Sequence, residues 1–254
     1  MSFALSVIRL GGSVHFQILE SSDGRRSPQN DNRETRVHAI LLVTMVQWIP
    51  LIVAGLLLSF PFVLLRDNLR ALVNTPLTTQ ELLFLLQRAA GLFAFTLIFI
   101  QIVLGSGRDL LSQIYPASDI IKIHRLIGKI AFALVLAHPL LIIITPNLFF
   151  TFWQQDSLAI SLGITALVLI LITVPTAIWP ARIGLSWIKI HRLNYLVFAL
   201  VIIHSRRIGV DTGGPLIYWW YISLGTIAAI LFLRKAVLWV KPTILKSDPI
   251  IQKT

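Results

Sequence analysis

Four histidines stand inside two apolar segments as two matched pairs. His124 and His138 are 14 positions apart in one segment, and His191 and His204 are 13 positions apart in the other. On an α-helix that rises about 1.5 Å per residue, each spacing covers about 20 Å, which fits within a hydrocarbon core of about 30 Å. Two such helices side by side would form two stacked sites, each with one imidazole from each helix.

Two opposed imidazoles suit the iron of a b-type haem, because the macrocycle fills the other four coordination positions. A bare zinc or iron site normally has three or four protein ligands, often with a carboxylate or a thiolate among them. The chain has no cysteine, and its 11 acidic residues lie in arms, loops or at helix edges. The same lack of deep carboxylates argues against an ion or proton pump. We therefore expect two haem b groups, held noncovalently, with four axial iron ligands: His124, His191, His138 and His204.

The alternative is that these histidines only form hydrogen bonds within a helical bundle. A single histidine in a membrane helix is as readily explained in that way as by ligation. Two pairs with nearly the same separation make coincidence a poor explanation, whereas His15 and His38 lie outside the pattern. Cofactor ligation is therefore the preferred hypothesis, and a cofactor-free transporter or scaffold is its rival. The sequence indicates no catalytic acid, base or nucleophile.

The elements that must position these histidines are membrane helices. The chain has 254 residues, of which 56% are hydrophobic, and several charge-free stretches are long enough to span a bilayer. We predict an all-α integral membrane protein, a six-transmembrane-helix bundle, with helices at about 38–65, 83–105, 120–145, 158–179, 187–208 and 216–240. Residues 1–37 would form a cytoplasmic or interfacial arm, 38–240 the haem-binding domain and 241–254 a short cytoplasmic tail.

The positive charge of the chain indicates topology rather than nucleic-acid binding. The formal net charge is +11, but the basic residues stand at the ends of apolar spans. Only Arg66, Arg70, Arg206 and Arg207 fall on one side of the predicted membrane, apart from Arg88 within the second helix. The positive-inside rule then places both termini in the cytoplasm. Helices three and five both run outward, so the inner pair is His124 with His191, and the outer pair is His138 with His204.

Five arginines are candidates for binding the haem propionates. Arg125 and Arg192 directly follow the inner histidines, and Arg206 and Arg207 follow His204 within three positions. The tendency of basic residues to stand at the cytoplasmic ends of membrane helices explains Arg125 and Arg192 equally well. Arg88 lies inside the outer end of the second helix, where we expect it to bind a propionate or the electron acceptor, or else to snorkel to the interface.

The fifth helix cannot be ideal throughout. At 100° per residue, His138 returns to within about 40° of the direction of His124, whereas His204 lies about 140° from His191. A π-bulge or a tightened turn between Asn194 and Ile203 would restore a common facing. Otherwise the two haem planes are rotated relative to each other.

Over residues 83–240 the chain resembles the ferric reductase-like transmembrane domain of ferric reductases and NADPH oxidases. The matching segments are HRLIGKIAFALVLAHP, from His124 to Pro139, and HRLNYLVFALVIIH, from His191 to His204. The resemblance implies electron transfer through two haems, from a cytoplasmic FAD and NAD(P)H donor to ferric iron or oxygen outside. The protein would then be a multi-pass component of the cell membrane and part of an oxidoreductase.

The flavin and nicotinamide domains have no place in the 14 residues that follow the sixth helix. We therefore expect a separate cytoplasmic flavoprotein donor, or a longer product of which this is the membrane part. The extracytoplasmic acceptor stays open, because no loop carries a recognisable acceptor motif. The alternative is a haem subunit that delivers electrons to a periplasmic partner protein, as in methionine sulfoxide reductase systems. That branch lacks the inner histidine that His124 supplies here, so the reductase and oxidase branch is preferred.

Overall fold

The computed structural model of the chain describes residues 4–10, 13–19, 31–74, 76–184, 186–209 and 214–247. Within this part, six helical spans are long and apolar enough to cross a membrane, as the sequence predicted. The helices that form them are α1 (Asp31–Asn74), α2 (Thr79–Ser106), α4 (Ala117–Ile144), α6 (Ser157–Ile178), α8 (Ser186–His191) with α9 (Asn194–Ile208), and α10 (Pro215–Ser247). The names inner and outer for the two histidine pairs follow the orientation predicted from the charges.

Several elements were not predicted. Three short helices lie in the connections: α3 (Arg108–Leu111), α5 (Leu148–Gln155) and α7 (Pro180–Ile183). Ahead of the helices, β1 (Ala4–Leu10) and β2 (Ser13–Leu19) pair as an antiparallel hairpin in the expected N-terminal arm. Helix α1 begins at residue 31 rather than 38, and α10 extends to residue 247 rather than 240. The remainder of the expected tail, 248–254, lies outside the described residues.

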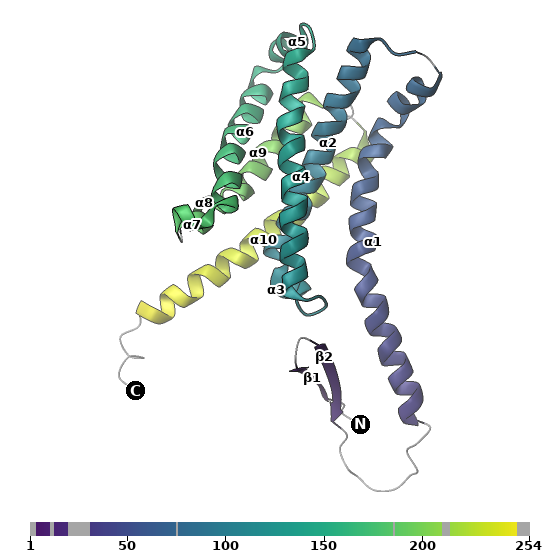
Figure 1. The fold of residues 1–254 in the computed structure, drawn as a ribbon, viewed down its shortest axis with the longest axis vertical. Coiled ribbons are helices and arrows are strands. Elements are labelled where there is room, and N and C mark those ends of the chain that lie inside the picture. The colour runs from purple at the N-terminus through teal and green to yellow at the C-terminus, as the bar shows by residue number, and fades with distance from the viewer. Residues whose placement is uncertain are drawn as a thin grey trace.

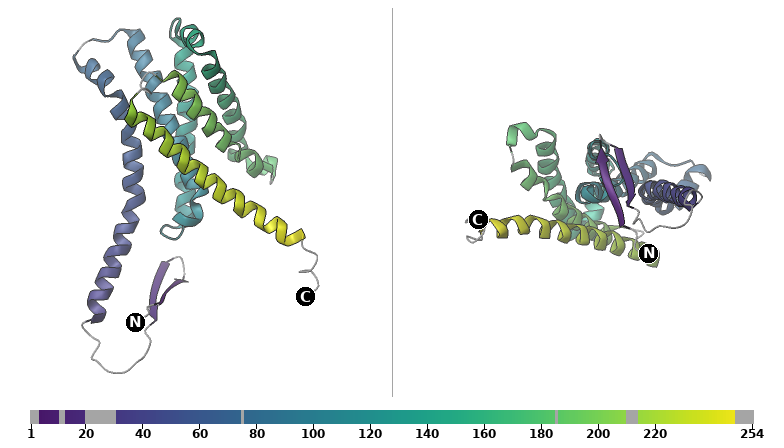
Figure 2. Two further views of the ribbon diagram at one scale, coloured as in Figure 1. Left: turned by 180° about the vertical axis from the view of Figure 1, so that it is seen from behind. Right: turned by 90° about the horizontal axis from the view of Figure 1, so that it is seen from below.

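The bundle is built on two helix pairs. Helix α4 packs chiefly on α2, and α9 packs chiefly on α6, while α1 contacts α2. Figure 1 shows α2, α4 and α6 running roughly side by side, with α10 crossing them diagonally. Seen from behind in Figure 2, α10 lies in front, and it contacts α2 and α9. The histidines therefore lie on different helix pairs, with His124 and His138 on α4, His191 at the end of α8 and His204 on α9.

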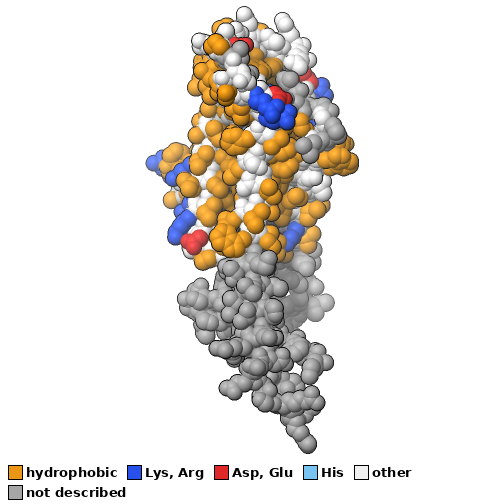
Figure 3. Space-filling view, turned by 90° about the vertical axis from the view of Figure 1, so that its right-hand side faces the viewer, with side chains coloured by type: hydrophobic (Ala, Val, Ile, Leu, Met, Phe, Trp, Pro, Cys, Tyr) orange, Lys and Arg blue, Asp and Glu red, His pale blue; other side chains and the backbone are white. Residues whose placement is uncertain are grey.

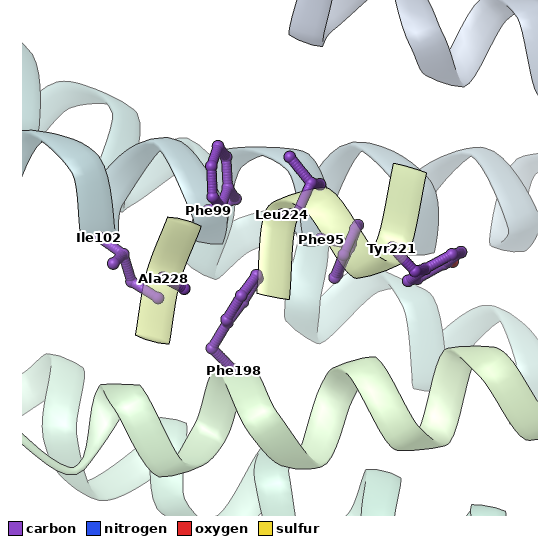
Figure 4. Packing of buried hydrophobic residues seen from close by; sticks show 7 residues of the cluster. All are labelled: Phe95, Phe99, Ile102, Phe198, Tyr221, Leu224 and Ala228. Atoms are coloured by element: carbon purple, nitrogen blue, oxygen red, sulfur yellow. The ribbon is translucent and has the colours of Figure 1, made fainter. Parts of the chain in front are cut away.

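An aromatic cluster joins α10 to this arrangement. Figure 4 shows side chains from three helices meeting, and Phe95 and Phe198 stack with ring centroids 5.5 Å apart. The buried members are Phe95, Phe99 and Ile102 of α2, Phe198 of α9, and Tyr221, Leu224 and Ala228 of α10. Close packing of these large rings, rather than their removal from water, holds α9 beside α2, because lipid is as apolar as the side chains.

A second apolar cluster lies between the two histidine levels. It contains Ala166 and Ile170 of α6 and Val197 of α9, with Phe132 and Val135 of α4 packed against them. Phe132 and Val135 stand between His124 and His138 in the sequence, and Val197 stands between the histidines of the other segment. We call these five residues the middle layer. All five side chains are apolar.

The outside of the bundle is apolar. Leu126 of α4, for example, is 61% exposed, directly beside the inner histidine level. Figure 3 shows a face made mostly of hydrophobic side chains, with the charged ones in a few separate groups. A large exposed apolar surface of this kind is expected where lipid, rather than water, surrounds the protein.

Candidate functional site

The two inner histidines lie opposite each other, as predicted from topology. The ring centroids of His124 and His191 are 6.2 Å apart, and their planes meet at 76°. Metal–imidazole bonds are about 2 Å long and a ring centre lies about 1 Å behind its nitrogen, so two imidazoles on opposite sides of one ion have centres about 6 Å apart. The separation of the inner pair would therefore allow His124 and His191 to hold one metal ion between them.

Each outer histidine is held by a backbone carbonyl. Nδ1 of His138 lies 2.8 Å from the carbonyl oxygen of Gln87 on α2, and Nδ1 of His204 lies 2.7 Å from that of Ala159 on α6. A carbonyl can only accept, so both Nδ1 atoms carry the hydrogen and both Nε2 atoms keep the lone pair. Metal-binding histidines usually donate their second ring N–H in this way, which fixes the ring and makes it a better ligand.

Glycines make room for these rings. A Cβ atom on Gly91 would lie 2.9 Å from Nδ1 of His138, and one on Gly163 would lie 2.8 Å from Nδ1 of His204. In both cases the accepting carbonyl, on Gln87 or Ala159, is four residues earlier, one helical turn away. The two outer histidines thus occupy equivalent seats on α2 and α6. Each seat consists of a carbonyl and a glycine one turn later.

The inner pair is held differently. The side-chain amide of Asn194 lies 3.1 Å from Nδ1 of His191 and accepts a hydrogen bond of 2.7 Å from the fully buried hydroxyl of Thr173. If the Asn194 amide is rotated by 180°, its oxygen rather than its nitrogen faces Nδ1 of His191. Nδ1 then donates the hydrogen, and Nε2 keeps the lone pair that a metal ligand needs. Among the described residues, Nδ1 of His124 and Nε2 of Gln101 are buried side-chain atoms without a hydrogen-bond partner.

Helix five is irregular, as predicted, but at a different place. The chain leaves α8 at His191 and re-enters a helix at Asn194, with i to i+3 hydrogen bonds from Leu193 N to Ile190 O (3.0 Å) and from Tyr195 N to Arg192 O (3.2 Å). The expected irregularity lay between residues 194 and 203. A tightened turn rotates about 120° per residue, compared with about 100° in an α-helix. The extra rotation turns His204 in the direction that brings it toward the side of the helix on which His191 lies.

The outer arginines have partners within the protein. Arg88 donates to the side chain of Asn68 and to the carbonyl of Leu64, both on α1. Arg207 forms an ion pair of 2.7 Å with Asp156, and the guanidinium of Arg206 lies 5.0 Å from the ring centre of Tyr218. These contacts were not predicted, and a role of the three arginines in binding propionates stays a prediction. Of the two that follow the inner histidines, Arg125 is exposed and Arg192 is partly buried.

Two carboxylates outside the spanning segments are held ionised. Asp109, on α3, accepts hydrogen bonds from Arg234 and Lys235 of α10, and the bond from Arg234 is the main reason that its pKa lies far below the usual value. The pKa of Asp156 is also lowered, first by the backbone N–H of Ala159 and then by Arg207. Each carboxylate joins two helices, one at each end of the bundle.

A cavity of about 360 Å³ opens at the outer end. It has the amides of Asn68 and Gln80 and the carboxylate of Glu81 in its lining, beside Thr145, seven residues beyond His138. Its other lining residues are Leu77, Phe84, Leu85 and Leu148. Since Asn68 also binds Arg88, this guanidinium lies next to the cavity rather than within the bundle centre.

The glycine seats were missed by sequence reasoning, although the sequence contains a signal. Gly91 and Gly105 on α2 are 14 positions apart, the same spacing as His124 and His138, and each follows a glutamine by four positions. Because α2 and α4 are antiparallel, Gly91 faces the outer histidine and Gly105 the inner one, with its Cβ position 3.6 Å from Cε1 of His124. The matched spacing on the neighbouring helix therefore locates the seat at Gly91 and the glycine that faces His124.

These observations define a class of protein: a helical membrane bundle with two imidazole pairs at two depths, separated by an apolar layer. Among the described residues, no three His, Cys, Asp or Glu side chains converge as a bare metal site would require. The family model described as ferric reductase like transmembrane component matches residues 90–202. Residues 90–202 thus match a ferric reductase-like transmembrane component, as the resemblance indicated. No curated protein matches the chain significantly.

Proposed function

We propose that this protein carries electrons across the cell membrane through two b-type haems, one held by the inner pair and one by the outer pair. The observation that carries the proposal is the equivalence of the two outer histidines. Each donates Nδ1–H to a carbonyl, lies against a glycine and keeps the Nε2 lone pair. A histidine with a purely structural role needs a hydrogen-bond partner. It does not need a second histidine, on the opposite helix pair, that is held in the same tautomer.

A bound haem supplies one-electron redox chemistry. The protein contributes the axial ligands, the hydrogen bonds that orient them and the middle layer that keeps the two levels apart. The lateral surface is apolar, so lipid surrounds the two sites. In the proposed orientation, electrons enter at His124 and His191 from a cytoplasmic flavoprotein that uses FAD and NAD(P)H. They leave at His138 and His204 to an acceptor outside, such as ferric iron or oxygen.

The test is an absorption spectrum of the purified protein, oxidised and then reduced with dithionite, with haem measured per polypeptide. We expect two low-spin b haems in the unaltered protein. His138→Ala and His204→Ala should each remove the outer haem, and His124→Ala and His191→Ala should each remove the inner haem. A protein that binds no haem when expressed with sufficient haem would refute the proposal, and so would variants that retain both haems.

The acceptor is tested with the reduced protein in vesicles. Re-oxidation by a membrane-impermeant ferric chelate or by oxygen, lost in His138→Ala, would support a reductase or oxidase. Re-oxidation by neither, although both haems are present, would favour delivery to a periplasmic partner protein instead. The cavity beside Asn68 and Thr145 is where a small acceptor would approach the outer level, and Asn68→Leu should slow re-oxidation if the acceptor binds there.

A further inference from the structure

Asp156 links the surface of the bundle to the outer histidine on α9. It is the residue before α6, and its side chain is only 14% exposed. Oδ1 accepts a hydrogen bond of 3.0 Å from the backbone N–H of Ala159, and Oδ2 accepts one of 2.7 Å from Nε of Arg207. The carboxylate therefore caps α6 and at the same time binds the outer end of α9.

The residue that Asp156 caps is the one that holds the histidine. The side chain of Ala159 is completely buried, and its carbonyl accepts the Nδ1 hydrogen of His204 at 2.7 Å. Arg207 lies three residues after His204 on the same helix. The contacts thus form a closed circuit, from the imidazole to Ala159, from Ala159 to Asp156, from Asp156 to Arg207 and back along α9.

We propose that Asp156 is a positioning residue of the outer site, which sets the place of the Ala159 carbonyl and through it the orientation of His204. The inference rests on the proposed function, since it treats His204 as a haem ligand. The carboxylate holds the first turn of α6 through the N–H of Ala159. Arg207 ties this turn to the helix that carries the histidine. Arg207 accordingly acts on His204 through Asp156.

An ordinary helix cap would have a different effect. Loss of a cap lowers stability by about 1 kcal/mol, without changing one cofactor more than another. Loss of a positioning contact changes the axial ligand, and so the affinity and reduction potential of the outer haem alone. Asp119 offers a matched control, because it lies in the first turn of α4 and pairs with Lys122 at 3.0 Å without contacting a histidine.

The experiment compares Asp156→Ala, Asp156→Asn and Asp119→Ala with the unaltered protein. Haem content and the midpoint potential of each haem are measured, and the outer haem is identified by its absence in His138→Ala. For Asp156→Ala we expect the haem content to fall from two toward one per chain, or the outer potential alone to shift. Asparagine keeps the cap acceptor but cannot also accept from Arg207, so it should restore the outer haem only in part, whereas Asp119→Ala should leave both haems unchanged.

Arg207→Gln should change the outer haem in the same direction as Asp156→Ala, and the double variant should be no worse than Asp156→Ala alone. Two haems at unaltered potentials in well-folded Asp156→Ala protein would overturn the inference while leaving the proposed function intact. Equal changes in both haems would also overturn it, because they would indicate general destabilisation. An unaltered protein without haem would instead overturn the proposed function, and this inference with it.

Discussion

The imidazole planes of His124 and His191 meet at 76°, close to a right angle, across a centre-to-centre distance of 6.2 Å. The two rings come from α4 and from the last residue of α8. If a haem were held between them, the two imidazoles would interact with different d orbitals of the iron. The proposed inner site would then have a spectroscopic signature of its own.

The first prediction concerns electron paramagnetic resonance of the frozen, oxidised protein. Near-perpendicular axial planes leave two iron d orbitals almost equal in energy, so the inner haem should give a highly anisotropic low-spin signal with a large principal g value. His124→Ala should abolish this signal, and His138→Ala should leave it in place. A rhombic signal typical of parallel planes, assigned to the inner haem, would contradict the geometry.

The second prediction concerns the glycine seats. Gly91→Ala and Gly163→Ala place a methyl group within 2.9 Å of an outer imidazole, so each should expel the ring and lower haem content from two toward one per chain. With Gly105→Ala, the new Cβ lies 3.6 Å from Cε1 of His124, and the variant should keep both haems.

Gly55 is the control for helix propensity, because a Cβ atom there would have no other atom within 4 Å. Alanine at this position should stabilise the helix by up to about 1 kcal/mol. Pyridine haemochrome assays and thermal melts measure the two effects.

The third prediction concerns Asn194. Its amide bridges His191 and the buried hydroxyl of Thr173, so Asn194→Leu should leave that hydroxyl unsatisfied and release the histidine ring. We expect a cost of about 1 to 3 kcal/mol in stability and weaker binding of the inner haem, with the outer haem unchanged. Thr173→Val removes the second contact only, and should have the smaller effect on haem. An Asn194→Leu protein with a normal inner haem would show that the bridge is dispensable.

The fourth prediction concerns pH and the contact between α3 and α10. Arg234, followed by Lys235, holds the pKa of Asp109 well below its usual value. A carboxylate with a lowered pKa contributes stability that is complete above its unfolded value near 4 and is lost only as the pH falls through the folded value. Asp109→Asn should therefore lower the melting temperature slightly at pH 5 to 8, less at high salt, and make no difference in strong acid. A difference that grew below pH 3 would contradict this assignment.

The sequence was sufficient to predict the pairing of His124 with His191, because charge bias and helix order place them at one level. It also indicated that the fifth helix departs from ideal geometry, since a spacing of 13 cannot bring His204 to the same side as His191. It did not locate the break, because the position of a tightened turn depends on where Asn194 finds partners on α6. The orientation in the membrane stays a prediction.

Long-range partners were beyond the reach of the sequence. Arg207 and Asp156 are 51 positions apart, and nothing in either segment shows that α6 and α9 meet at that end. The contacts of Arg88 to Asn68 and Leu64 arise from the packing of α1 on α2, which the sequence does not show, and its expected role toward a propionate or an acceptor stays a prediction. The seat formed by Gly91 could have been found, because its spacing to Gly105 repeats that of the histidines.

The middle layer has a further consequence for energy conversion. Phe132, Val135, Ala166, Ile170 and Val197 contain no group that can bind or release a proton. If electrons pass from the inner to the outer level as proposed, these five side chains offer no route for an accompanying proton, and each turnover would transfer net charge. In the proposed orientation, an inside-negative membrane potential would then drive the transfer at about 2.3 kcal/mol per electron for each 100 mV, and turnover would depolarise the membrane.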